Sequence, residues 1–276
     1  MIKPQFYAST KQRELINSAV TWLQAGYKVA MLSLVYIEGN APYPVGSQML
    51  VRDDGEFEGQ LTGGCAEIAL VQQALVAIEK QQNITERYGA GSRYFDIQLP
   101  CGSGLDIAFD VQSTLEDYQA IASFLTLREA VKVSDVKTYY PNPRLLLFGQ
   151  GPILDDLIDL ATQSGFDVMR FEANELYDLC SYCDQYTALV SLFHEHDLEI
   201  DILLSVLDAE LFYIGALGSQ KTQLARLKKL EERGVSSQQL KKIHGPVGLN
   251  IGAVTPSQIA VSVLAQVIAV MNNHAP

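Results

Sequence analysis

The stretch Leu145-Leu-Leu-Phe-Gly-Gln-Gly-Pro152 decides the fold of the second half of this chain. Its first four residues are apolar, as in a buried strand, and a helical pattern starts directly after the turn at Gly149 and Gly151. A strand that passes through a tight glycine turn into a helix points free backbone N–H groups and a helix dipole at an anion. The stretch therefore predicts an α/β domain whose first turn can hold a phosphate.

Strand and helix patterns alternate after this stretch, which predicts a doubly wound, Rossmann-like parallel sheet with helices on both faces. Glu172 ends the second expected strand, where an acidic side chain can bind a ribose 2′-OH. His194 follows the third, at the carboxyl edge where such sheets bind ligands. The third glycine of the dinucleotide fingerprint is replaced by Leu154, so a tight turn that binds nothing stays an alternative.

A second glycine turn, Tyr213-Ile-Gly-Ala-Leu-Gly-Ser219, again leads from a strand into a helix. Ser219 can cap this helix, and Lys221 and Arg226 add positive charge. A lysine in the first turn opposes the helix dipole, which fits a bound phosphate better than helix stability alone. The candidate anion-binding residues here are Gly215, Gly218, Ser219 and Lys221, and a solvated lysine on an exposed turn is the alternative.

The first ~110 residues have another pattern, which predicts an α+β domain built on a mixed sheet. Helices are expected at 11–26 and 66–80, and a hairpin turn at 53–55. Ser113-Thr-Leu-Glu116 reads as a capping box that opens a further helix. We place this domain at residues 1–130, a polar linker at 131–143 and the Rossmann-like domain at 144–276.

Two of the four cysteines lie in glycine-rich turns, Cys65 in Gly63-Gly-Cys-Ala-Glu67 and Cys101 in Cys101-Gly-Ser-Gly104. A thiol with little bulk around it, such as one at the start of a helix, can ligate a soft metal or carry sulfur. Both cysteines are candidate metal ligands. The alternative interpretation is that these are two glycine bends in which the cysteines have no function. The candidate cofactor-binding residues of these turns are Gly63, Gly64, Cys65, Glu67, Cys101 and Gly102.

The pair Cys180-x-x-Cys183, followed by His194-x-His196, does not have the usual spacing of a structural zinc site. A redox pair is one interpretation of this C-x-x-C motif. Two small, partly buried residues are the interpretation we favour.

The composition is that of a soluble globular protein of 276 residues, with 48% hydrophobic and 19% charged residues. Its formal net charge of −12 disfavours binding to nucleic acid and to anionic membranes. The N-terminus lacks a signal-peptide pattern, and no stretch is apolar enough to span a bilayer. We therefore expect a cytoplasmic protein whose cysteines are thiols or ligands and do not form a disulfide framework.

Six motifs extend over nearly the whole chain, at 41–51, 63–67, 101–102, 148–151, 213–219 and 244–256. Together they resemble the XdhC/CoxI family. The resemblance implies an N-terminal XdhC/CoxI domain, a C-terminal Rossmann-like domain and an accessory role for molybdenum hydroxylases such as xanthine dehydrogenase. Family members are understood to bind molybdenum cofactor (molybdopterin), support its sulfuration and deliver it to the apoenzyme.

The chain departs from the family pattern at three positions where acids are common, because amides stand at Asn250, Gln258 and Gln266. An amide keeps an acceptor but has no charge, which argues against acid–base or metal chemistry at these positions.

Three functions follow from these observations. The first is a cofactor-binding chaperone without turnover of its own, which serves a molybdenum hydroxylase apoenzyme. Its further candidate partners are a sulfur-donating enzyme and a second copy of the chain. The second is an NAD(P)-dependent oxidoreductase, which the Gly149–Gly151 turn and Glu172 favour. The third is a non-catalytic interaction protein that retains the fold.

Overall fold

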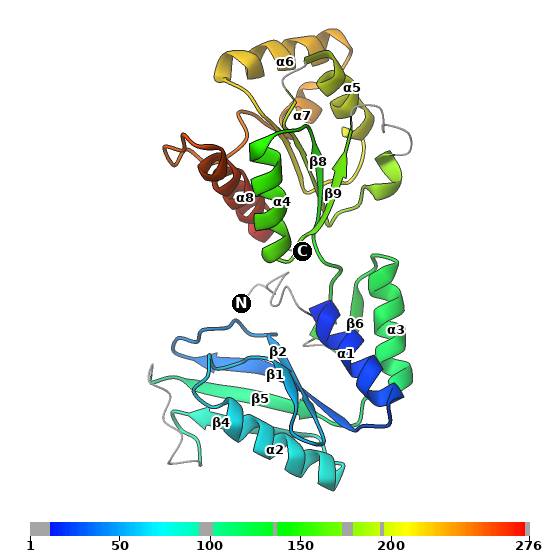
Figure 1. Ribbon diagram of the computed structural model, residues 1–276, viewed down its shortest axis with the longest axis vertical. Helices are drawn as coiled ribbons and strands as arrows, with labels where there is room; N and C mark the ends of the chain where they lie inside the picture. Colours follow the sequence, from blue (N-terminus) through cyan, green and yellow to red (C-terminus); the bar gives the residue numbers. More distant parts are fainter. Residues whose placement is uncertain (1–11, 94–101, 135–136, 173–178, 194–195, 274–276) are drawn as a thin grey trace. The chain divides into compact units, whose positions relative to one another are not determined.

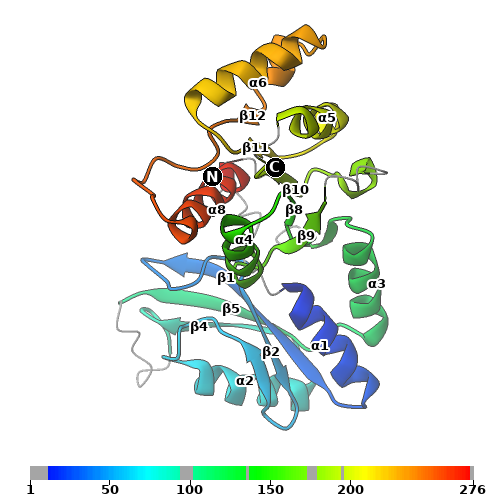
Figure 2. The same cartoon turned by 45° about the horizontal axis from the view of Figure 1, so that its top comes forward.

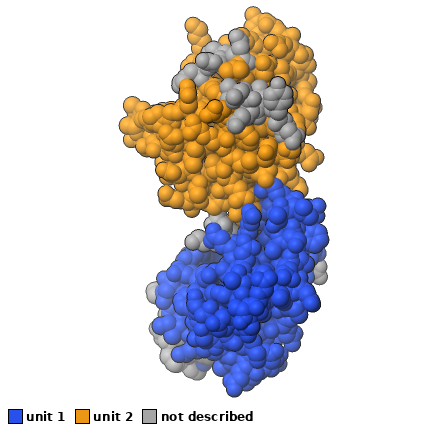
Figure 3. Space-filling model, turned by 45° about the vertical axis from the view of Figure 1, so that its right-hand side comes forward, with its two compact units in different colours: residues 1–141 blue, residues 142–276 orange. Residues whose placement is uncertain are grey.

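The chain divides into two compact units, residues 1–141 and 142–276, which Figure 3 colours separately. The computed structural model describes residues 12–93, 102–134, 137–172, 179–193 and 196–273. Within this part of the chain, no helix combines the length and the apolar character that a membrane span requires.

Unit 1 is an antiparallel sheet with helices on both faces (Figures 1 and 2). The strand order is β3-β2-β1-β5-β4, and α2 connects the two edge strands in sequence. The elements are α1 (Gln12–Gln24), β1 (Val29–Glu38), β2 (Gln48–Arg52), β3 (Phe57–Gly59), α2 (Glu67–Lys80), β4 (Ile84–Gly89), β5 (Gly104–Asp110), α3 (Leu115–Thr126), β6 (Val131–Ser134) and β7 (Lys137–Tyr139).

The alternation of apolar residues along β1 explains why both faces of the sheet are covered. Ala30, Leu32 and Leu34 pack in the core beneath α2. Val29 and Met31 point to the opposite face, where α1 and α3 lie side by side (Figure 1). The first domain thus has two hydrophobic cores that share one sheet.

Three expectations for this unit were wrong in detail. The described pairings of β1–β5 are all antiparallel, so the sheet is not mixed. The capping box of α3 consists of Thr114 and Asp117, one residue later than expected, because the Asp117 carboxylate accepts from the Thr114 N–H at 2.8 Å. The expected linker contains the β6–β7 ribbon, and Tyr139 is buried against α1 and α3 because its ring fills that core.

Unit 2 is a five-stranded parallel sheet of order β12-β11-β10-β8-β9. Its helices lie on both faces, α4 beside α8 on one face and α5 and α6 on the other (Figures 1 and 2). The elements are β8 (Arg144–Phe148), α4 (Pro152–Gln163), β9 (Asp167–Phe171), the 3₁₀ turn η1 (Leu179–Tyr182), β10 (Thr187–Ser191), α5 (His196–Val206), β11 (Tyr213–Ala216), α6 (Gln220–Glu232), α7 (Ser237–Leu240), β12 (Ile243–His244) and α8 (Pro256–Asn273).

The order of the strands fixes where this sheet can bind a ligand. The chain passes from β8 outward to β9 and then returns to the other side of β8 to form β10. Connections therefore leave β8 and β10 in opposite directions, and an open parallel sheet binds ligands at the carboxyl ends of such a strand pair. The turn at Gly149 and Gly151 lies at this position.

Candidate functional site

Three loops of unit 1 lie at one end of its sheet because the strands are antiparallel. The carboxyl end of β1 is adjacent to the amino ends of β2 and β5. The loops 39–47 and 60–66 and the described ends of the third loop, 90–93 and 102–103, therefore lie at the same end (Figure 1). The second loop contains the Cys65 turn, and the described part of the third resumes at Gly102, directly after Cys101.

The Cys65 turn is open on its outer side. Gly63 and Gly64 have φ of +73° and +98°, a region that residues with a side chain rarely adopt. A Cβ added to Gly64 would meet no other atom within 4 Å. Cys65 itself is exposed and free, so its thiol can be reached from solvent.

Glu67 holds this turn in place. Its carboxylate accepts hydrogen bonds from the Thr62 N–H at 2.7 Å, the Gly64 N–H at 2.8 Å and the Leu61 N–H at 3.2 Å, and from the Thr62 hydroxyl. Burial opposes ionisation of this group, but the hydrogen bonds from Thr62 and the backbone outweigh it and hold the Glu67 pKa below its ordinary value. The carboxylate thus shapes the turn from within.

Cys101 lies outside the described residues, but the residues that follow it are placed. Gly102 is exposed, and Ser103 is buried with its Oγ donating to the Asn40 carbonyl oxygen and accepting from the Asn40 N–H at 3.1 Å. Pro42 lies in the same loop as Asn40, between β1 and β2. Its ring is 3.5 Å from the position that a Cβ on Gly63 would occupy. The loop after β1 therefore contacts the Cys65 turn and the residues next to Cys101.

In unit 2, the backbone turn after β8 approaches the end of β10 very closely. Gly149 has φ of +131°, and a Cβ there would lie 3.0 Å from the carbonyl carbon of Leu192. The Leu192 N–H donates to the Phe148 carbonyl oxygen at 2.7 Å. This close approach requires a glycine, and His194, two residues beyond Leu192, lies outside the described residues.

The amino end of α4 has the features of an anion cradle. Its N-cap is Gly151, which makes no side-chain cap and has open space where a Cβ would be. Pro152 occupies the first helical position and is exposed. Glu172, directly after β9, is also exposed. Pro152 has no N–H, and the Leu154 N–H donates to the Gly151 carbonyl oxygen at 2.9 Å. The Ile153 N–H is therefore the donor that the first turn of this helix can offer to an anionic ligand.

The second glycine turn is built differently. Ser219 caps α6 by accepting from the Thr222 N–H at 3.1 Å, so part of the helix end is satisfied by the chain itself. Gly215 is packed among other residues, because a Cβ there would meet the Tyr213 ring at 2.6 Å. Gly218 has φ of +145° and Lys221 is exposed.

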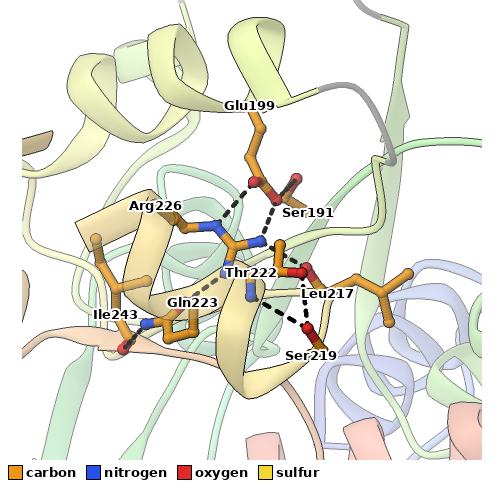
Figure 4. A network of polar contacts seen from close by, with 8 residues as sticks. All are labelled: Ser191, Glu199, Leu217, Ser219, Thr222, Gln223, Arg226 and Ile243. Carbon is orange, nitrogen blue, oxygen red and sulfur yellow. Dashed lines mark hydrogen bonds and ion pairs between the residues drawn. The ribbon is translucent and has the colours of Figure 1, made fainter. Parts of the chain in front are cut away.

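The expectation that Arg226 adds charge to this turn was wrong. Arg226 is buried and pairs with Glu199, whose Oε2 lies 2.8 Å from its Nε (Figure 4). It also donates to the carbonyl oxygen of Leu217 and to the side chain of Gln223. Because Glu199 neutralises it, the arginine holds the turn and is not a ligand for an external anion.

Two of the three amides have structural roles. The Gln266 Oε1 accepts from the Tyr213 hydroxyl at 2.6 Å and from the Gly248 N–H at 2.7 Å. The Gln258 Oε1 accepts from the Val254 N–H at 2.9 Å at the start of α8. Asn250 lies in the loop before α8 and is exposed.

No set of three or more His, Cys, Asp or Glu side chains within the described ranges is arranged to hold a metal ion. Cys101 is not among these residues. The exposed Cys65 thiol is therefore the soft donor that unit 1 presents in its described part.

The chain matches two family models, the XdhC and CoxI family at residues 22–89 and the XdhC Rossmann domain at residues 145–267. It is 31% identical to a molybdenum cofactor insertion chaperone, PaoD, from Escherichia coli (strain K12), and the alignment covers 96% of this chain and 91% of that protein. The chain belongs to the XdhC and CoxI family.

Other relatives of this XdhC/CoxI-family protein are more distant. It is 24% identical to a probable subunit of xanthine dehydrogenase from Bacillus subtilis (strain 168), over 87% of this chain and 92% of that one. A crystal structure from Bacillus halodurans, described as a xanthine dehydrogenase, has a TM-score of 0.75 at 21% identity and covers 94% of this chain and 96% of its own. At this identity the solved structure supports the fold alone.

Proposed function

We propose that this XdhC/CoxI-family protein is a maturation factor for a molybdenum hydroxylase of the xanthine dehydrogenase type. In this proposal it works in the cytoplasm, binds molybdenum cofactor as cargo, supports the sulfuration of the cofactor and delivers it to the apoenzyme. Its partners are that apoenzyme and a sulfur-donating enzyme. The observation that carries the proposal is the 31% identity to the insertion chaperone PaoD over 96% of the chain.

The residues of unit 1 fit the metal end of this cargo. Molybdenum cofactor carries a dithiolene-bound metal, and thiolates are soft ligands that suit sulfur-rich metal centres. Cys65 is exposed beside Gly64, which leaves room for a bulky ligand to reach the thiol. Cys101 is the second proposed ligand, since Ser103 and the Cys65 turn contact the same loop.

The residues of unit 2 fit an anionic group such as the phosphate of the cofactor. The start of α4 has no side-chain cap, so the Ile153 N–H can donate to an anion, and Gly151 leaves space in front of it. Gly149, Glu172, His194 and the turn with Gly215, Gly218, Ser219 and Lys221 are the further proposed binding residues. The role of each of these residues can be tested directly by measuring cofactor binding.

The experiment measures equilibrium binding of cofactor released from a purified molybdoenzyme. We expect the wild-type protein to bind, and Cys65→Ala and Cys101→Ala to weaken binding by about tenfold or more each, which is ~1.4 kcal/mol. The matched control is Cys180→Ala, which removes an exposed thiol from the other unit. Absence of binding by the wild type, or equal binding by all variants, contradicts the proposal.

An NAD(P)-dependent oxidoreductase is the second candidate. It is favoured by the tight turn at Gly149, by the open space at Gly151 and by Glu172 directly after the neighbouring strand β9. A titration with NAD(P) distinguishes the two functions. Micromolar binding of NAD(P) that is abolished in Glu172→Ala favours the oxidoreductase. If NAD(P) does not bind, the chaperone is the favoured function.

The third candidate is a non-catalytic interaction protein. Such a protein should bind the apoenzyme in the absence of both molybdenum cofactor and NAD(P). A pull-down with the apoenzyme, with and without cofactor, tests this. Light scattering on the free protein tests the proposed homodimer.

A further inference from the structure

Cys180 lies in the 3₁₀ turn η1 and Cys183 directly follows it, at a spacing that a disulfide can bridge. The Cys183 N–H donates to the Cys180 carbonyl oxygen at 3.1 Å. A hydrogen-bonded turn of four residues brings its first and last Cα atoms within about 7 Å, and side chains three residues apart in a 3₁₀ turn lie on one side. Disulfides join Cα atoms that are about 4.4–6.8 Å apart.

The surroundings fix the backbone of this turn. Leu179 is buried in the core of unit 2, at 1% exposure. The Tyr182 carbonyl oxygen accepts from Arg144 Nη1 at 2.8 Å and from Thr187 Oγ1 at 3.2 Å. The Tyr182 ring packs edge-on against Phe171, with 5.4 Å between centroids. The two cysteines are therefore carried by a turn whose backbone is held by contacts with the core and with the neighbouring strands.

The two thiols have different environments. Cys180 is exposed, and its Sγ donates to the Ser205 carbonyl oxygen at 3.2 Å. Cys183 is half-buried against the core, and its Sγ donates to the Leu179 carbonyl oxygen at 3.4 Å. Burial, with nearby Cys180 and Asp184 adding to it, raises the Cys183 pKa to about 11. A reagent from solvent can therefore reach the Cys180 thiol first. The half-buried Cys183 thiol can react in a second step, from the protein side.

We propose that Cys180 and Cys183 form a thiol–disulfide exchange site for disulfides of small thiols. The Cys180 thiolate attacks one sulfur of the small disulfide, an S–S bond to the protein forms, and the first small thiolate leaves and takes up the proton that Cys180 lost. Cys183 then loses its proton, and its sulfur attacks the Cys180 sulfur. The second small thiolate leaves with that proton, so the protein dithiol is oxidised by two electrons and the small disulfide is reduced to two thiols.

The two cysteines of this site are not among the residues proposed to bind the cofactor. Cys180 and Cys183 lie in unit 2, whereas Cys65 and Cys101 belong to unit 1. Loss of exchange and loss of cofactor binding can therefore be measured separately, in different variants of the full chain.

The experiment treats the reduced full-length protein with oxidised glutathione, blocks the remaining thiols by alkylation and maps the peptide that contains both cysteines by mass spectrometry. In the wild type we expect this peptide to lose two hydrogens and to retain no glutathione. In Cys183→Ser, glutathione should stay on Cys180 at least about tenfold longer, because the intramolecular thiol that displaces it is missing. In Cys180→Ser, the internal disulfide should not form.

Cys65→Ser is the matched control, since it removes an exposed thiol from the other unit and should leave the mapped peptide unchanged. The proposal is overturned if wild-type Cys180 retains glutathione as long as Cys183→Ser does. It is also overturned if Cys180 and Cys183 stay reduced while Cys65 reacts. Circular dichroism of both serine variants checks that each is folded before exchange is measured.

Discussion

Arg226 and Glu199 form a buried ion pair that connects α6 to α5, with Nε 2.8 Å from Oε2 and both side chains 1% exposed. The pair reaches the ends of two strands. Glu199 accepts from the hydroxyl of Ser191, the last residue of β10, at 3.1 Å, and Arg226 donates to the carbonyl oxygen of Leu217, directly after β11. Figure 4 shows the guanidinium group in contact with Glu199, Leu217 and Gln223, and Ser191 beside Glu199. The loops at this part of the carboxyl edge are thus fixed by one charged pair.

Arg226→Met should lower the free energy of unfolding by about 3–5 kcal/mol, because it leaves the Glu199 carboxylate buried without a partner. The double variant Glu199→Met/Arg226→Met should lose less than this, since no buried charge is left. Urea unfolding of the three proteins provides the measurement. Arg233→Met is the control, because its 3.8 Å pair with Asp201 is exposed and should change stability by less than about 1 kcal/mol. Equal losses in the single and double variants would contradict the prediction.

Glu67→Gln should lower stability by about 1–3 kcal/mol at neutral pH, because the buried donors of the Cys65 turn lose a charged acceptor. The Glu67 pKa is lower in the folded protein than in the unfolded chain, where it is about 4.3. Its contribution is therefore present above that value and is lost as the pH falls through the folded pKa. Urea unfolding at several pH values should show the difference between wild type and variant shrinking in acid.

The control for this pH series is Glu79→Gln, which changes an exposed carboxyl of the same helix. It should stay within about 0.5 kcal/mol of the wild type at neutral pH. If the difference in unfolding free energy between the wild type and Glu67→Gln grows as the pH falls, the lowered pKa of Glu67 is contradicted.

Gly149→Ala should destabilise the protein more than Gly151→Ala. Both glycines have positive φ, so each alanine has a backbone cost of about 1–2 kcal/mol. At Gly149 the new Cβ would also lie 3.0 Å from the Leu192 carbonyl carbon, whereas at Gly151 it meets nothing within 4 Å. Thermal unfolding of the two variants measures the order. A Gly151 variant that unfolds first disproves the steric argument.

Gln266→Leu should cost about 1–3 kcal/mol, because the Tyr213 hydroxyl and the Gly248 N–H lose their acceptor. Gln266→Glu keeps an acceptor at the same place and should retain most of the stability. Denaturant unfolding compares the two variants. If leucine is tolerated better than glutamate, the acceptor role of Gln266 is wrong.

Elements with a strong local pattern could be predicted from the sequence. The apolar run before Gly149 became β8, and Thr255-Pro-Ser-Gln258 became the capped start of α8. The order of the strands could not be predicted in this way, because it depends on which strands pair at long range. The mixed sheet expected for unit 1 was wrong for the same reason: its pairings are antiparallel throughout the described strands.

The candidate site could be predicted only where the backbone itself carries the signal. Glycines marked the turns at Gly64 and Gly151, and both turns are open. No pattern in the sequence indicated which charged side chains are buried. The sequence suggests a surface charge at Arg226 because its partner Glu199 lies on another helix, and a single sequence does not show which helices face each other. The interior role of Glu67 was also missed, although Glu67 follows Thr62 and Gly64 closely in the chain.

The turn after β8 presents main-chain atoms where many proteins present side chains. Gly149 lies against the backbone at Leu192, and Gly151 leaves the helix start uncovered. Main-chain N–H groups are encoded by every residue except proline, so ordinary substitutions cannot delete them. A relative can therefore exchange the polar side chains around this turn and keep the Ile153 N–H as a donor, as long as the two glycines preserve the shape of the turn.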